Sequence, residues 1–186
     1  MIGELPKNLN VNGKEWAIRS DFRVALHVFQ AMNDVDLDEA EKITVMLDLV
    51  YENFNDMSEN DYAEAMKQAV WYLNGGKPNE DYHGDQRIMD WEQDEQMIFS
   101  AVNKVANKET RECEYIHWWT FLGYFSEIGE GLFSTVISIR NKKNKGRKLE
   151  KHELDFYRNN KSTINLKTRY TEEEKEEIER LKKLFD

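Results

Sequence analysis

The chain has 186 residues, of which 40% are hydrophobic and 33% charged, and its formal net charge is -10. This apolar content is enough for one compact domain and excludes a chain that is disordered throughout. No segment reaches the roughly 18 apolar residues of a membrane span, and no basic start followed by an apolar stretch indicates a secretion signal. We therefore expect no membrane association and a protein that stays in the cytoplasm, where its single cysteine, Cys113, forms no internal disulfide.

The charge is distributed unevenly along the chain. Residues 1–139 carry 11 basic and 26 acidic side chains, whereas residues 140–186 carry 15 basic and 10 acidic ones. The net charges of these two parts are therefore -15 and +5. The negative total net charge argues that the surface as a whole does not bind nucleic acid. The opposite charges of the two parts suggest contacts between oppositely charged surfaces.

The first predicted element is a β-hairpin whose turn is Asn12-Gly13. Apolar side chains alternate before and after the turn, at Leu9, Val11, Trp16 and Ile18. Asn-Gly readily adopts the positive φ angles that a tight hairpin turn requires. Because an isolated hairpin is only marginally stable in water, we expect its apolar side to pack on helices.

Three amphipathic helices are predicted after the hairpin. Ser20 is the predicted N-cap of the first helix, and the acidic turn at residues 34–38 precedes the second. The third helix begins at Ser58 and Asp61 and ends at Asn74-Gly75-Gly76. Their predicted buried stripes are Phe22, Ala25, Leu26 and Phe29; Ile43, Leu47, Val50 and Phe54; and Tyr62, Ala65, Met66, Ala69, Val70 and Leu73.

The second half of the chain also has a helical pattern. A capping box at Asp90 and Gln93 predicts one helix, and Glu109 or Thr110 begins another that runs through Phe125. Further helices are predicted for residues 132–143 and 149–157, and a short one after Thr171 with Ile178, Leu181 and Phe185 on one side. The predicted fold is mainly α: a compact multi-helix domain with an N-terminal hairpin over residues 1–160, then a linker and acidic amphipathic helix over residues 161–186.

Three patterns resemble catalytic or metal sites but are incomplete. Asp34, Asp36 and Asp38 have the spacing of a calcium loop without its glycine and its final glutamate. Glu114-x-x-His117 has the spacing of a di-iron motif, and its only second copy, Glu80-x-x-His83, lies in a Gly- and Pro-containing loop. Cys113 could meet His117 on one helix, but no oxyanion donor or orienting group accompanies them. We therefore expect no enzyme, no metal and no cofactor.

The aromatic segment 115–125 is the strongest candidate for a binding function. It comprises Tyr115, Trp118, Trp119, Phe121, Tyr124 and Phe125. Successive helical positions point about 100° apart, so these side chains surround most of the helix. Two interpretations stay open: a central helix enclosed by its neighbours, or an aromatic face left for a partner.

A basic run follows the aromatic segment. Its members are Arg140, Lys142, Lys143, Lys145, Arg147, Lys148 and Lys151. The run can be a solvated turn, a patch for an acidic protein surface such as the acidic part of another copy, or a phosphate-binding site. Neither a docking element nor stacking aromatics accompany it, so nucleic acid is the least favoured of the three.

Five separated segments resemble one family of phage proteins. They are IRSDFR (18–23), WYLNGG (71–76), MDWE (89–92), YIHWWTFLG (115–123) and FSTVISIR (133–140). They are similar to the small tail proteins of long-tailed phages and prophages of Gram-positive bacteria, whose genes typically lie just before the tape-measure gene. The resemblance extends from about Gly3 to Leu166 and does not include the acidic end from Tyr170 to Asp186.

The resemblance implies a tail assembly chaperone in the host cytoplasm. Such a protein coats the tape-measure protein, helps to recruit tail-tube subunits and is absent from the mature virion. It implies self-association and binding to these two partners, with the aromatic segment and the basic run as candidate contacts. A nucleic-acid-binding or regulatory phage protein that uses residues 140–151 is the alternative.

Overall fold

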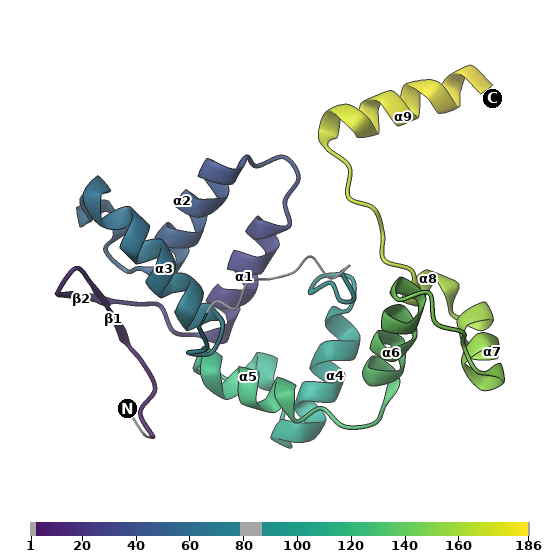
Figure 1. The fold of residues 1–186 in the computed structure, drawn as a ribbon, viewed down its shortest axis with the longest axis horizontal. Coiled ribbons are helices and arrows are strands. Elements are labelled where there is room, and N and C mark those ends of the chain that lie inside the picture. The colour runs from purple at the N-terminus through teal and green to yellow at the C-terminus, as the bar shows by residue number, and fades with distance from the viewer. Residues whose placement is uncertain (1–2, 79–86, 186) are drawn as a thin grey trace.

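The computed structural model describes residues 3–78 and 87–185. In these residues the fold is mainly α, with one two-stranded sheet at the N-terminus, as the sequence predicts. Figure 1 shows the hairpin and helices α1 to α3 at one end of the molecule, α4 and α5 in the middle and α6 to α8 at the other end.

The hairpin forms where Asn-Gly predicts it. Strands β1 (Asn8–Val11) and β2 (Lys14–Ala17) are antiparallel, with Leu9 opposite Trp16. The two turn residues have φ angles of 51° and 87°. Leu9, Val11 and Trp16 are buried, and β1 lies against helix α3.

Helices α1 (Phe22–Met32) and α2 (Glu39–Val50) differ from the prediction in detail. The N-cap of α1 is Asp21, not Ser20: the Asp21 carboxylate accepts a hydrogen bond from the Arg23 amide at 2.9 Å. Ser20 is one residue too early and shares a 2.7 Å hydrogen bond with the Tyr115 hydroxyl. On α2 the predicted stripe is wrong at Ile43, which is 36% exposed.

The next two helices lie close to their predicted positions. Phe54, predicted on α2, lies after that helix in a 3-10 turn (Phe54–Asp56), and a second turn (Glu59–Asp61) leads into α3 (Tyr62–Leu73). Helix α4 (Glu95–Ala106) begins later than expected. The predicted capping box is only half formed, because Asp90 accepts from the Gln93 amide at 2.8 Å while the Gln93 side chain bonds residues 165 and 167.

The helix predicted from Glu109 or Thr110 through Phe125 is not continuous. A 3-10 turn (Thr110–Glu112) and an extended stretch precede α5 (Trp118–Ser126). The reason is pairing with the segment before α1. The Phe22 amide donates to the Ile116 carbonyl at 2.9 Å, and the Trp118 amide donates to the Ser20 carbonyl at 2.8 Å. These two bonds hold residues 116–118 in a short antiparallel bridge that helical spacing does not reveal.

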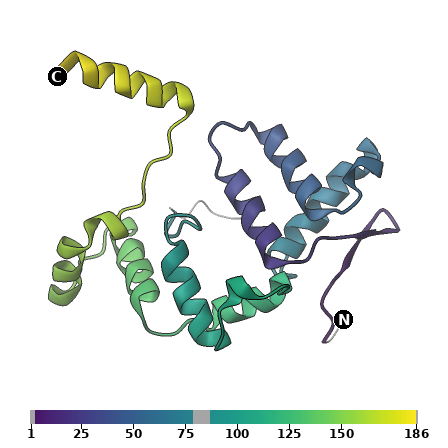
Figure 2. The same ribbon diagram turned by 180° about the vertical axis from the view of Figure 1, so that it is seen from behind.

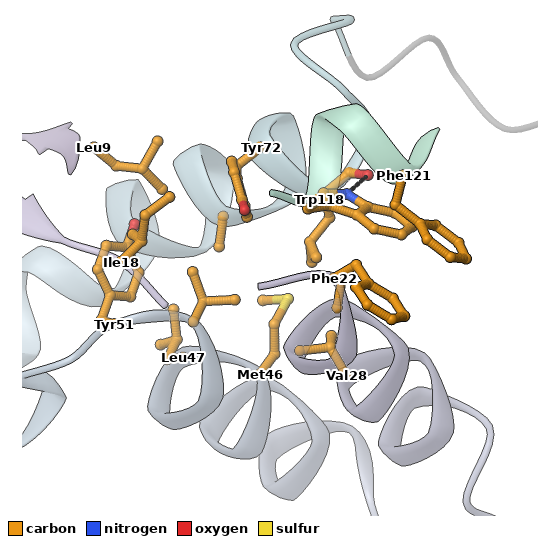
Figure 3. Close-up of a cluster of buried hydrophobic side chains, with 14 of the residues drawn as sticks. Leu9, Ile18, Phe22, Val28, Met46, Leu47, Tyr51, Tyr72, Trp118 and Phe121 are labelled. Carbon is orange, nitrogen blue, oxygen red and sulfur yellow. Dashed lines mark hydrogen bonds between the residues drawn. The ribbon is translucent and has the colours of Figure 1, made fainter. Parts of the chain in front are cut away.

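Four helices complete the chain: α6 (Leu132–Asn144), α7 (Lys151–Asn159), the unpredicted α8 (Lys161–Ile164) and α9 (Glu172–Phe185). Figures 1 and 2 both show α9 standing apart from the other helices at the end of an extended linker. Most buried apolar side chains form one cluster from the hairpin and α1 to α5, part of which Figure 3 shows. A second, small cluster consists of Val136, Ile139 and Ile164.

Candidate partner-binding surface

His117 fixes the start of α5, the helix that carries the aromatic segment. Its Nδ1 accepts a hydrogen bond from the Trp119 amide at 3.0 Å, and its Nε2 lies 2.9 Å from the Pro6 carbonyl oxygen. These partners assign the proton to Nε2. Burial lowers the pKa of His117, so the neutral imidazole is the form that the fold selects.

Two adjacent tryptophans bind the end of α3. The indole of Trp118 donates to the Leu73 carbonyl at 2.9 Å, and that of Trp119 donates to the Tyr72 carbonyl at 2.8 Å. Both carbonyls belong to the last turn of a helix, where no later amide of the same helix is available. The Trp-Trp pair therefore locks α5 to α3 through polar as well as apolar contacts.

Gly76 allows the Trp119 ring to lie close to the chain after α3. It has a φ of +81°, and a Cβ added there would lie 2.8 Å from an indole carbon of Trp119. A side chain at this position would thus be strained by its backbone and would clash with the ring. The Gly-Gly that ends α3 thereby positions an aromatic side chain.

Two of the aromatic candidates are interior residues. Trp118 and Phe121 are at most 1% exposed, and the Phe121 ring stacks on Phe22 with centroids 4.5 Å apart. Figure 3 shows both side chains within the same cluster as Phe22 and Tyr72. We therefore remove Trp118 and Phe121 from the surface that a partner could contact and assign them to the core.

The other aromatic candidates remain partly accessible. Trp119, Tyr124 and Phe125 are half-buried, and Tyr115 is 51% exposed. Trp119 borders a hollow of about 450 Å³, here called the tryptophan groove. Its lining combines apolar residues, among them Phe29, Leu73, Trp91 and Leu122, with Gly123 and the polar residues Asn74, Lys77 and Ser126. A Cβ at Gly123 would meet no atom within 4 Å, so the wall is open at this point.

A second hollow, of about 490 Å³, lies between α4 and the connection from α5 to α6. Its apolar lining includes Met97, Val105, Ile128 and Phe133, together with Leu132, which is 53% exposed. Sequence reasoning did not identify this hollow, because its residues come from two helices and a loop that were predicted separately.

Arg140, the first residue of the basic run, is buried and is fully bonded. Its guanidinium forms a bidentate ion pair with Asp94, at 2.5 and 2.8 Å, and donates to the carbonyls of Ile88, Thr163 and Ile164 at 3.1, 2.8 and 2.6 Å. All five of its N–H donors are therefore used. Arg140 ties α6 to α4 and α8, and we remove it from the candidate surface.

The rest of the basic run divides into paired and unpaired side chains. Lys142 lies 2.5 Å from Glu153, and Lys143 bonds Asn165 at 2.9 Å and lies 3.9 Å from the Tyr157 ring centroid. Among the described residues, four exposed side chains of the run form no hydrogen bond or ion pair. These four residues, here called the free basic turn, are Lys145, Arg147, Lys148 and Lys151.

The candidate thiol and metal pairs do not assemble in the described residues. Cys113 and His117 lie in the extended stretch before α5, and the Cys113 thiol is 3.6 Å from the Glu109 carbonyl. Glu114 is exposed, while both ring nitrogens of His117 bond the backbone. Glu80 and His83, the predicted second motif, lie outside the described residues.

No group of three or more His, Cys, Asp or Glu side chains within residues 3–78 and 87–185 has a metal-binding arrangement. In the same part of the chain, no helix has the length and apolarity needed to cross a bilayer.

The combination of a mainly α fold, a small hairpin and an aromatic helix packed end-on against α3 occurs here in a bacteriophage protein. Residues 1–166 match the family described as Bacteriophage Gp15 protein, and the chain belongs to that family. No curated protein and no solved structure matches the chain. The matched part contains the hairpin, α1 to α8, the tryptophan groove and the free basic turn, whereas α9 lies outside it.

Proposed function

We propose that this protein is a tail assembly chaperone that coats the tape-measure protein in the host cytoplasm, helps to recruit tail-tube subunits and leaves before the virion matures. Membership of the phage family supports a role in phage biology, and the resemblance to small tail proteins supports this particular one. A tape-measure protein is a very long, largely helical chain whose apolar surface would aggregate if it were left uncovered.

The tryptophan groove is the observation that carries the proposal. An amphipathic helix binds by placing its apolar side chains into an apolar groove. Trp119, Leu122 and Trp91 offer such a lining, and Trp119 is held in place by its bond to the Tyr72 carbonyl. A partner helix would thus meet a rigid aromatic wall that is already formed, which lowers the entropic cost of binding.

Filling the groove at Gly123 tests the proposal directly. A Gly123→Trp variant places a large ring where the wall is open, and Gly123→Ala is the matched control because it adds only a methyl group. In a pull-down against purified tape-measure fragments, we expect wild type and Gly123→Ala to bind. The Gly123→Trp variant should lose at least about tenfold in affinity, the loss expected when an interface core is blocked.

Folding and phage assembly provide the controls for this experiment. Gly123 is exposed, so neither variant should unfold at a lower temperature than wild type. Deletion of the gene should alter tail length or yield in the phage. Wild-type protein that captures no tape-measure fragment, or capture that is equal for Gly123→Trp and wild type, would contradict the proposed groove.

A second candidate function is nucleic-acid binding through the free basic turn. Its four exposed cations have no partner among the described residues and could contact phosphates. This function predicts DNA or RNA binding that weakens steeply with added salt and is lost in a Lys145→Glu/Arg147→Glu/Lys148→Glu variant. Absence of any binding at low salt would eliminate it.

A further inference from the structure

Helix α9 begins at a firmly anchored point of the molecule. The Lys167 amide donates to the Gln93 side chain at 2.9 Å, and Arg169 pairs with Asp90 and Glu92 at 2.8 and 2.6 Å. At the start of α9, the Glu172 amide donates to the Asp36 carboxylate at 3.1 Å. The linker is thus bonded to the turn before α4 and to the turn between α1 and α2, so α9 leaves the body in a defined place.

Beyond this anchor, α9 is amphipathic, and Figures 1 and 2 show it apart from the other helices. Leu181 is 45% exposed, and Ile178 lies one turn before it on the same side of the helix. Residues 172–179 carry six glutamates and one lysine. A helix of this length is marginally stable on its own in water, so an apolar contact would favour it.

The complementary surface lies on α6 and α7. The free basic turn carries four exposed cations, opposite in charge to residues 172–179, the first two turns of α9. Behind it, the second apolar cluster has only three buried members, and Phe156 and Tyr157 of α7 pack against it while half-buried. An amphipathic acidic helix would pair its carboxylates with the cations of the turn, and its apolar side chains would bury more of this small cluster.

We propose that α9 is an arm that docks on the free basic turn and α7 of a second copy of this chain. The bonds at Arg169 and Glu172 hold the base of α9 beside the α1–α2 turn. Figures 1 and 2 both show α9 separated by a wide gap from α6 and α7 of its own chain. The basic surface of the same chain is therefore not the one that α9 covers.

Such a contact joins two different surfaces and can be repeated from copy to copy. A heterologous contact that does not close into a ring produces an open helical assembly. The inference extends the proposed function, because an arm of this kind would link neighbouring copies in a coat on a long partner. Binding of the tape-measure protein depends on another surface, the tryptophan groove, so the two proposals can fail independently.

Charge reversal on full-length protein tests the arm. The first variant is Glu173→Lys/Glu176→Lys/Glu177→Lys, three glutamates with no hydrogen bond or ion pair in the described structure. The second is Lys145→Glu/Arg147→Glu/Lys148→Glu on the free basic turn. We expect wild type to self-associate at low salt and each variant alone to associate at least about tenfold more weakly, as three contacts change from attraction to repulsion.

Mixing the two variants separates docking between copies from docking within one chain. In the mixture, the basic arm of one variant meets the acidic turn of the other, and the acidic arm meets the basic turn. Light scattering of the 1:1 mixture should therefore show association restored towards the wild-type level. Circular dichroism of each variant checks that α9 stays helical, and Glu112→Lys/Glu114→Lys/Glu130→Lys, which reverses three exposed glutamates elsewhere, should associate like wild type.

Three results would overturn the proposal. One is a wild-type protein that stays monomeric throughout the titration. Another is equal loss of association in the control variant, which would indicate a general charge effect. The third is a mixture that remains monomeric although one chain carrying both sets of reversals behaves like wild type, which would place the contact within a single chain. Unchanged tape-measure capture alongside any of these results would leave the chaperone function intact.

Discussion

The two ends of the molecule are held together by different forces. The hairpin and α1 to α5 share an extensive apolar cluster that includes Phe22, Tyr72 and Trp118. The α6–α8 region has a cluster with only three buried apolar side chains, and Arg140 links α6 to the segment before α4 through a buried ion pair with Asp94 and a hydrogen bond to the Ile88 carbonyl. The burial of a large apolar area stabilises the first region, and this stabilisation does not depend on the exact orientation of each side chain. A buried ion pair stabilises only when its hydrogen-bond geometry is correct.

This difference predicts how each region responds to substitution. The apolar core can lose one contact and retain many others, because its stabilisation is spread over a large area. The α6–α8 region has no comparable reserve, and the partner of Arg140, Asp94, has no exposed surface. Loss of the guanidinium would leave a buried, uncompensated carboxylate.

The largest expected effect is that of Arg140→Ala. We expect the free energy of unfolding to fall by about 3–5 kcal/mol, the cost of breaking a buried ion pair by removing one partner. Urea denaturation followed by circular dichroism measures it. Arg158→Ala is the control: Arg158 and its partner Asp155 are both exposed, so the substitution should cost no more than about 1 kcal/mol.

A double substitution sharpens this prediction. Arg140→Met with Asp94→Asn removes both charges and keeps an amide oxygen that can accept from the Asp90 amide, which now donates to Asp94 at 3.0 Å. If the unpaired carboxylate causes the loss, the double variant should be clearly more stable than Arg140→Ala. A double variant no more stable than the single one would show that the bonds to Ile88, Thr163 and Ile164 are what matter.

Local patterns predicted the hairpin and most helices because their determinants lie close together in the sequence. Asn12-Gly13 specifies a turn, and the spacing of Ala65, Ala69 and Leu73 specifies a helix face. The continuous helix from Thr110 to Phe125 was wrong because a distant segment, Ser20 to Phe22, pairs with residues 116–118. A tertiary contact of this kind leaves no periodic signal in either segment.

The candidate site was predictable only in part for the same reason. The pattern identified the aromatic helix, but which rings are buried depends on α1 and α3 packing against it. Arg140 is different, because its sequence signal was present: Phe133, Val136 and Arg140 lie three and four residues apart, on the buried stripe of α6. Because Arg140 is also the first residue of the basic run, it was predicted to be a surface contact and not a buried residue of α6.

The second largest effect is that of Gly76→Ala, at the contact between the end of α3 and Trp119 of α5. Gly76→Ala introduces a side chain at a φ of +81° and brings Cβ to 2.8 Å from the Trp119 ring. We expect a loss of about 2 kcal/mol, of which the backbone accounts for about 1–2 kcal/mol. Gly146→Ala is a matched control, since Gly146 also has positive φ but no atom lies within 4 Å of its added Cβ.

Comparing these two glycine variants by thermal unfolding separates backbone strain from the clash. Gly146→Ala should show only the backbone cost, and Gly76→Ala should show that cost and the displacement of Trp119. A shift in tryptophan fluorescence should accompany Gly76→Ala alone. Equal losses with unchanged fluorescence would mean that the ring moves aside freely and that α5 is not locked to α3 as described.

A smaller effect, of opposite sign, is expected at Gly123. This residue lies within α5, has no positive φ and has open space around its added Cβ. Gly123→Ala should therefore raise the free energy of unfolding by about 0.5–1 kcal/mol, because alanine loses less conformational freedom in a helix. A destabilised Gly123→Ala variant would show that the wall of the tryptophan groove is less open than the structure indicates.

The smallest expected effect is the pH dependence that His117 adds to the apolar region. Burial lowers its pKa in the folded protein below the ordinary value of 6.5, so between these two values the unfolded chain binds more protons than the folded one. The stabilisation is complete above about pH 6.5 and declines as the pH falls below it. Urea titrations across this range should show the decline in wild type.

His117→Asn isolates this contribution, because asparagine can still accept from the Trp119 amide as an N-cap but does not titrate in this range. His27→Gln is the control, since His27 is an exposed residue of α1. We expect the decline between about pH 7 and 5 to be shallower in His117→Asn and unchanged in His27→Gln. Identical slopes in wild type and His117→Asn would mean that His117 binds the same number of protons in the folded and the unfolded chain, and a pKa lowered by burial would then be wrong.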